Sequence, residues 1–246
     1  MNTLTTSFVR RLRDRDETAW FELWQVFGPV LRAQLARWGK GRIGVETVRD
    51  LTQETLAALS DSIDRYDPAR GARFSTWLLS IAKHALGDEI DRRMALKRGA
   101  GRKPTEFDER FMSKAADAEA DEAYEQNVFR AKVYAAIRQA EPEADFLQFQ
   151  VYRMRVFDGL LGKEVAEQLG ISEPTVSRHL HRIRGLLRRR LAETISTYSF
   201  TEDEQREAAQ AGLGEDDSTF DEALCDIYHK QSQLILQDET AASAAF

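Results

Sequence analysis

Apolar residues recur every three or four positions along most of the chain, the spacing that gathers them on one face of an α-helix. The pattern predicts helices over residues 16–38, 74–97 and 218–237, a helix capped by Thr47, and a compact helical module over residues 128–191. We find no strand-like alternation of apolar and polar residues and no internal repeat. We therefore expect an all-α protein.

The helical periodicity is lost before the compact module. Residues 100–127 begin with the segment GAGRKP and continue into acidic, alanine-rich sequence, which is typical of a tether. The expected fold has two small helical domains joined by a flexible acidic linker, the second a helix-turn-helix, and a C-terminal helical extension. The predicted limits are 1–99 for the first domain, 100–127 for the linker, 128–191 for the second domain and 192–246 for the extension.

The formal net charge of -6 hides an uneven distribution of charge along the chain. Residues 191–246 contain 13 acidic and 2 basic side chains, so the first 190 residues sum to +5. Residues 104–127 hold another 8 acidic and 2 basic side chains. Because a phosphate backbone responds to the local potential, the acidic total does not exclude nucleic-acid binding by the remaining segments.

Several classes of protein are disfavoured by composition and motifs. The single cysteine, Cys225, allows no internal disulfide and fits a reducing compartment. The N-terminal sequence has no apolar segment of the signal-peptide kind, and no apolar run approaches the roughly 20 residues of a membrane span. We expect a cytoplasmic location. The chain has no P-loop, no G-x-S-x-G motif and no metal-like spacing of histidine and cysteine, so we expect no enzyme, no cofactor and no metal site.

The strongest local pattern is KEVAEQLGISEPTVSRHLHRIRGLLRRRL, residues 163–191, which predicts a helix-turn-helix. Ala166 is small where the two helices must approach closely, and Gly170 suits the turn. Ser172 is expected to cap the second helix, and Pro174 falls in its first turn, where a missing amide donor does no harm.

The second helix of this motif has one apolar face and one basic face. The apolar stripe comprises Val176, Leu180, Ile183 and Leu187. The opposite face carries six arginines between Glu173 and Arg190, which suits a helix lying in the major groove of DNA. The residues expected near base edges are Thr175, Ser177, Arg178, His181 and Arg182, and those expected near phosphates are Arg184, Arg188, Arg189 and Arg190. The alternative is an amphipathic helix with a solvated arginine face.

The N-terminal domain supplies a second set of candidates. Asp50, Gln53 and Glu54 lie at the exposed start of a helix, where acidic groups also serve as ordinary capping. The following helix, RFSTWLLSIAKHAL, leads into a basic arm that reaches Lys103. Basic charge beside aromatic residues suits single-stranded DNA. Phe74 and Trp77, three residues apart, are alternatively core residues.

Taken in order, DLTQETLAAL, YDPARGARFSTWLLSIAKHAL, the basic arm and the helix-turn-helix resemble RNA polymerase sigma factors of the extracytoplasmic-function (ECF) type. The resemblance covers about residues 8–99 and 128–191. It implies that the chain binds core RNA polymerase, through the beta-prime clamp helices and the beta flap, and promoter DNA. It also implies promoter recognition, DNA melting and transcription initiation, without catalysis.

The resemblance also implies roles for individual residues. Asp50, Gln53 and Glu54 match the positions that bind the clamp helices, and the loop from Pro68 to Arg73 matches the segment that captures an extruded base of the minus-ten element. Residues implied in melting and minus-ten recognition are Arg70, Arg73, Phe74, Ser75, Thr76, Trp77, Lys83 and His84. Those implied in binding the minus-thirty-five element are Thr175, Ser177, Arg178, His181, Arg182 and Arg188. Lys83-His84 replaces a common Arg-Asn pair, so the resemblance leaves the base preference in the minus-ten element open. His84 is alternatively an ordinary helix histidine.

A stand-alone helix-turn-helix regulator is the alternative function. Such a protein would bind a duplex site by itself, usually as a dimer, and would not need the N-terminal motif. The sequence specifies neither the promoter, the inducing signal nor an anti-sigma partner.

Residues 192–246 lie outside the resemblance. Their charge of -11 over residues 191–246 is opposite to that of the recognition helix, and Thr201 with Glu204 forms a possible capping box. We hypothesise that this extension folds back on the chain's own domains and limits DNA binding, so that deleting it raises DNA affinity. The alternative is a solubilising tail or a docking helix for another protein.

Overall fold

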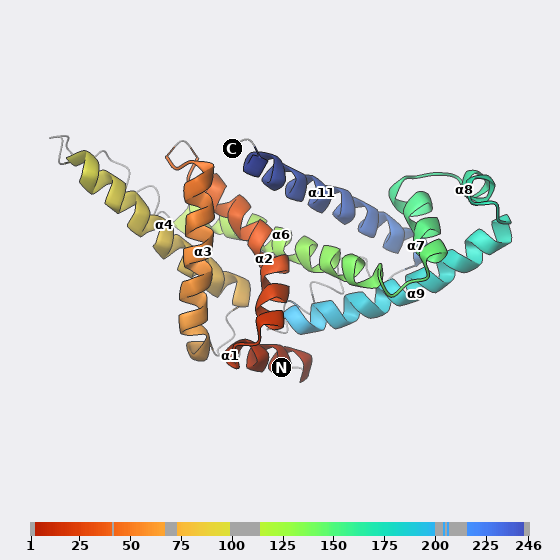
Figure 1. The fold of residues 1–246 in the computed structure, drawn as a ribbon, viewed down its shortest axis with the longest axis horizontal. Helices are drawn as coiled ribbons and strands as arrows, with labels where there is room; N and C mark the ends of the chain where they lie inside the picture. Colours follow the sequence, from red (N-terminus) through yellow and green to blue (C-terminus); the bar gives the residue numbers. More distant parts are fainter. Residues whose placement is uncertain are drawn as a thin grey trace. The chain divides into compact units, whose positions relative to one another are not determined.

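In the part of the chain that the computed structural model describes, each regular element is a helix (Figure 1), as the apolar pattern predicts. The structure describes residues 3–40, 42–66, 73–98, 114–199, 204, 206 and 216–243. Within these ranges no helix has the length and apolar character needed to cross a membrane. The chain divides into two compact units: an N-terminal unit of Val9–Val128 and Leu234–Phe246, and a helix-turn-helix unit of Met1–Phe8 and Phe129–Gln233.

Three long helices pack together in the N-terminal unit: α2 (Glu17–Trp38), α3 (Val45–Ser62) and α4 (Phe74–Arg98). The first begins where the sequence predicts, because the Asp16 side chain accepts hydrogen bonds from the backbone N–H groups of Thr18 and Ala19, at 2.8 and 3.2 Å. The core of this unit is aliphatic and aromatic, and its completely buried members include Leu12, Leu23, Leu31, Leu35, Leu59, Ile63, Phe74, Leu78 and Leu86.

The start of α3 differs from the prediction that Thr47 caps it. The helix begins at Val45, after Gly44 in extended conformation (φ -88°, ψ 174°). The carbonyl of Gly44 accepts the first helical hydrogen bond, from Val48 at 3.1 Å. Thr47 instead accepts a hydrogen bond at 2.6 Å from the guanidinium of Arg93 on α4. The predicted cap is therefore wrong, because its hydroxyl ties two helices together.

The helix-turn-helix unit is built on α9 (Glu173–Tyr198), against which α7 (Phe146–Tyr152) and α8 (Gly162–Leu169) pack. A π-helical turn, Arg153–Phe157, continues α7. Helix α6 spans Lys114–Ala140, so helix begins within the predicted linker, 14 residues before the point where the apolar periodicity returns. The first part of that linker, residues 100–113, lies outside the described residues.

The C-terminal extension contributes directly to this unit's core. Helix α11 (Asp217–Ser243) is longer than the predicted 218–237. Its residues Phe220 and Leu224 are completely buried, with Ile227 only 7% exposed, in one cluster with Leu187 of α9. The first part of α11 therefore belongs to the core of the folded unit and is not a separate tail.

The first helix, α1 (Thr3–Arg13), is an element that the apolar pattern did not reveal. The Thr5 hydroxyl lies within hydrogen-bond distance of the carbonyl oxygens of Ser196 and Ser199, at 2.6 and 3.2 Å. Phe8 packs edge-on against Tyr198, with ring centroids 5.0 Å apart. These contacts use the end of α9, which runs seven residues past the predicted limit of the second domain at Leu191.

Candidate nucleic-acid interface

The turn between α8 and α9 has the geometry that the sequence predicts. Gly170 adopts the left-handed conformation (φ 64°, ψ 33°), which lets the N–H of Ile171 reach the carbonyl of Ala166 at 3.0 Å. Ser172 occupies the N-cap position of α9, but its side chain does not cap the backbone; its hydroxyl is hydrogen-bonded to that of Thr175 at 2.9 Å. Pro174 lies in the first turn of α9, as predicted.

The two faces of α9 are separated as expected. Val176, Leu180, Ile183 and Leu187 are buried. Of the residues expected near base edges, Ser177, Arg178, His181 and Arg182 are exposed and Thr175 is half-buried. Arg178 donates a hydrogen bond to the Thr175 hydroxyl at 2.9 Å, which holds its guanidinium at the N-terminal end of the helix. This end therefore presents hydroxyl, imidazole and guanidinium groups, the set that reads base edges in the major groove.

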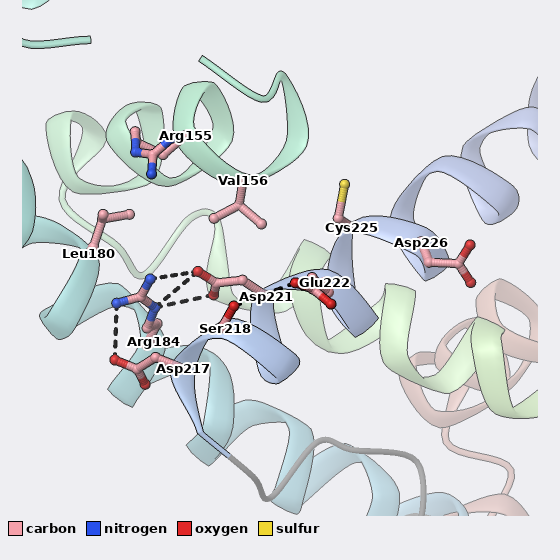
Figure 2. A pocket seen from close by; sticks show the side chains of 10 residues that line it. All are labelled: Arg155, Val156, Leu180, Arg184, Asp217, Ser218, Asp221, Glu222, Cys225 and Asp226. Atoms are coloured by element: carbon pink, nitrogen blue, oxygen red, sulfur yellow. Dashed lines mark hydrogen bonds and ion pairs between the residues drawn. The ribbon is translucent and has the colours of Figure 1, made fainter. Parts of the chain in front are cut away.

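The arginines farther along α9, which the sequence assigns to phosphate contacts, form ion pairs with acidic side chains of the chain itself. Figure 2 shows the Arg184 guanidinium between Asp217 and Asp221 of α11, at 3.0 Å from the first carboxylate and 2.6 Å from the second. Arg188 contacts Asp217 at 2.9 Å and lies over the Phe220 ring, 4.2 Å from its centroid. Arg189 and Arg190 both pair with Glu143, and Arg190 also pairs with Glu193.

The pairs of α9 with α11 shift the pKa values of Asp217 and Arg184. The hydrogen bond from Arg188 lowers the pKa of Asp217, and the charges of Arg184, Arg188 and His181 add to this effect. The hydrogen bond to Asp221 raises the pKa of Arg184. Asp221 also accepts a hydrogen bond from the Tyr152 hydroxyl at 3.0 Å. The sequence analysis missed this pairing, although Asp217 and Asp221 are spaced to share a helix face.

A pocket of about 670 Å³ lies beside these ion pairs, between the π-helical turn, α9 and α11 (Figure 2). Val156, Leu180 and Cys225 form part of its wall. Burial raises the pKa of the Cys225 thiol, which keeps it protonated and weakly nucleophilic. The Cys225 side chain is half-buried, a position that suits a small apolar residue more than a reactive one.

In the N-terminal unit, the three candidates on α3 share one face. Asp50, Gln53 and Glu54 are all exposed, at positions i, i+3 and i+4 of the helix. The arrangement gives a polar, acidic surface in the second and third turns of α3.

The aromatic candidates of α4 divide between core and surface. Phe74 is completely buried and packs against Phe27 and Tyr66, with ring centroids 5.4 and 5.3 Å apart. It is therefore a core residue, which was the alternative prediction for this position. Trp77 stacks on Tyr66 at 4.9 Å and remains partly exposed. The Lys83 ammonium lies 5.3 Å from the centroid of the Trp38 ring.

The remaining α4 candidates have partners within the protein. His84 is exposed, and its Nδ1 lies 2.7 Å from the carbonyl of Ser80, the contact of an ordinary helix histidine. Arg92 and Arg93, in the basic arm, both pair with Glu89. The hydrogen bond from Arg92, which has the larger effect, and that from Arg93 together lower the pKa of Glu89 to about 2. Arg70 and Pro68 lie outside the described residues.

The start of α4 binds a carboxylate that the sequence analysis did not single out. The hydroxyl of Ser75 donates to Glu125 of α6 at 2.7 Å, and that of Thr76 does so at 3.2 Å. Arg73 pairs with the same carboxylate at 3.4 Å. Three implied minus-ten residues therefore converge on one anion.

Together, the fold and these surfaces define a DNA-binding protein with two helical domains, one of them a helix-turn-helix. Two family models match the chain: sigma-70 region 2 over residues 23–95, and sigma-70 region 4 over residues 147–187. The chain belongs to the sigma-70 family. Among curated proteins we found no match.

These domains give the chain the role of a sigma factor in promoter recognition and transcription initiation, in interaction with core RNA polymerase and promoter DNA. A stand-alone regulator is not favoured, because it would have no use for region 2. Sigma factors act by binding and are not enzymes in the usual sense.

Proposed function

We propose that the chain is an ECF-type sigma factor, with a minus-ten domain over residues 1–99, a linker over 100–127 and a minus-thirty-five domain over 128–191. The region-4 match supports this type, since it is the form typical of ECF sigma factors. Such a factor works in the cytoplasm, where core polymerase and promoters meet. No cofactor or catalytic residue enters the proposal.

The single observation that carries the proposal is the division of α9 into a buried stripe and an exposed reading face. Arg178 and Arg182 are the two exposed arginines nearest the start of this helix. Arginine bound in bidentate fashion to guanine is the commonest specific contact in the major groove. Ser177 and His181 extend the same surface. We assign these side chains to the minus-thirty-five element.

The N-terminal unit carries the polymerase and minus-ten contacts in this proposal. The exposed polar face of α3, with Asp50, Gln53 and Glu54, binds the clamp helices of the beta-prime subunit, while the beta flap binds the second domain. The melted strand meets the start of α4, where Trp77 is partly exposed beside hydroxyl and guanidinium groups. Base–aromatic stacking contributes about 1–3 kcal/mol per base, so an accessible Trp77 favours the separated strand.

Transcription in vitro with core polymerase tests the proposal. An Arg178→Ala, Arg182→Ala double variant should lose most promoter-specific transcript, because a good bidentate contact is worth about 1–3 kcal/mol. A matched control, Arg138→Ala with Lys230→Ala, removes two exposed charges of the same unit outside α9 and should remain active. Wild-type protein that binds duplex DNA but never directs core polymerase would refute a sigma role.

Regulation of this activity, by an anti-sigma protein or by residues 192–246, forms part of the proposal. The position of α11 against α9 supports the second possibility, since its acids contact arginines of the DNA-binding helix.

A further inference from the structure

The arginines held by α11 lie on the same face of α9 as two of the proposed base-reading residues. An α-helix turns by about 100° per residue, so positions i, i+4, i+7 and i+11 lie within an arc of about 60°. Ser177, His181, Arg184 and Arg188 have this spacing. A duplex that contacts the first two side chains therefore brings its phosphates toward the last two.

The acids of α11 already contact this face. Asp217 lies 3.0 Å from Arg184 and 2.9 Å from Arg188, and Asp221 lies 2.6 Å from Arg184. The Arg184 side chain is only 17% exposed, whereas that of Asp217 is 48% exposed. The Asp217 carboxylate thus occupies an open position that a phosphate oxygen from solvent can also reach.

A second, independent observation comes from the N-terminal unit. Glu125 accepts from both Ser75 and Thr76 and pairs with Arg73, and its side chain is 20% exposed. Its neighbour Tyr124 is completely buried, which fixes this part of α6 in place. A carboxylate and a phosphodiester have the same charge of -1 and both accept hydrogen bonds through paired oxygens.

We infer that, in the free protein, the carboxylates of Asp217, Asp221 and Glu125 occupy positions that DNA phosphates take in the promoter complex. The inference rests on the proposed function. The internal carboxylates compete with DNA, so the sigma factor binds nucleic acid weakly until promoter contacts made with polymerase outweigh them. The buried apolar residues of α11 keep its acids in place. Asp217 and Asp221 compete with duplex DNA at α9, and Glu125 competes with single-stranded DNA at α4.

Substitution of Asp217 and Asp221 tests their competition with duplex DNA better than deletion of the extension does. Removing residues 192–246 would also remove Phe220 and Leu224, which are completely buried, and would mix lost competition with lost stability. Asp217→Asn with Asp221→Asn keeps the shape of α11 and removes two charges. The control, Glu222→Gln with Asp226→Asn, removes two charges from the same helix, from side chains of the exposed face.

The probe for this experiment is a labelled 30-base-pair duplex of arbitrary sequence, because phosphate contacts do not depend on sequence. For the Asp217→Asn, Asp221→Asn variant we expect about tenfold tighter binding at low salt. The slope of log K against log salt should steepen by about 1.8, which corresponds to two further phosphates. Equal changes in the control, or an unchanged slope, would overturn the inference. If the double variant melts early, Asp217→Asn alone should give about half the change in slope.

The variant that tests competition between Glu125 and single-stranded DNA is Glu125→Gln, and the probe is a labelled 12-nucleotide single strand. Its salt slope should steepen by about 0.7, the value for one phosphate of a single strand. Ser75→Ala added to Glu125→Gln should reverse the gain, since the hydroxyl is then missing. Glu122→Gln, an exposed neighbour on α6, is the matched control and should change nothing. A gain of the same size in this control would reject competition at α4.

Both experiments use the free protein and bare DNA. Their failure would leave promoter-directed transcription by the holoenzyme intact. Failure of that transcription would instead reject the sigma role itself.

Discussion

Tyr228 of α11 stacks face to face on Phe157, with ring centroids 4.0 Å apart and ring planes 2° from parallel. The neighbouring His229 places Nε2 2.9 Å from the carbonyl oxygen of Phe157. These contacts lie about two helical turns beyond Asp221 and three beyond Asp217, the acids near the start of α11. Aromatic packing therefore holds α11 against the helix-turn-helix unit independently of its ion pairs with α9.

Truncation of this stack should weaken the helix-turn-helix unit. Tyr228→Ala removes a half-buried ring and its stacking on Phe157, for which we expect a loss of about 1–3 kcal/mol in the free energy of unfolding. Urea unfolding measures this loss. Tyr228→Phe keeps the ring and should stay within about 0.5 kcal/mol of the wild type. An alanine variant as stable as the wild type would mean that α11 docks through other contacts.

A buried ion pair joins α6 to the extension. The Lys132 ammonium lies 2.9 Å from Glu204, with side chains 5% and 4% exposed. Glu204→Gln should lower the free energy of unfolding by about 3–5 kcal/mol, because it leaves a buried ammonium without its counter-charge. Glu204 was predicted to form a capping box with Thr201, which lies outside the described residues.

The double variant Lys132→Met, Glu204→Leu is the informative comparison. Apolar replacement of both members of a buried pair is often neutral or stabilising, so stability should return to near the wild-type value. Thermal unfolding of the single variants Lys132→Met and Glu204→Leu and of the double variant gives the coupling energy. If the double variant is less stable than Glu204→Gln, the pair would contribute more than its desolvation removes.

Local periodicity explains what could be predicted from the sequence. The inward stripe of α9 and the left-handed Gly170 follow from spacing and residue type within a few positions. The partners of Arg184 and Arg188 lie about 30 residues away, and neither helical period nor composition encodes which acid meets which base. Phe74 shows a related limit: an aromatic residue at a helix start fits both a core and a DNA surface until its neighbours are known.

The turn glycine offers a test of backbone geometry without steric effects. A Cβ on Gly170 would meet nothing within 4 Å. Gly170→Ala should therefore lower the free energy of unfolding by only about 1–2 kcal/mol, because alanine disfavours the left-handed backbone (φ 64°) of this position. Gly185→Ala, in the middle of α9 and equally open, is the matched control. It should raise stability by up to about 1 kcal/mol, because alanine favours the helix. Two substitutions of the same kind with the same sign would contradict the assigned turn geometry.

Acid should loosen the contact between Asp217 and the arginines of α9. Arg188 lowers the pKa of Asp217 in the folded protein, so the contribution is complete above the unfolded value, near 3.9, and is lost as pH falls through the lower folded value. The stability difference between the wild type and Asp217→Asn should therefore be constant above about pH 5 and shrink below about pH 4. Urea titrations between pH 3 and 7 measure it. In an Arg188→Met background, where the main cause of the shift is absent, the same substitution should show a much smaller pH dependence. An undiminished pH dependence there would assign the shift to a different neighbour.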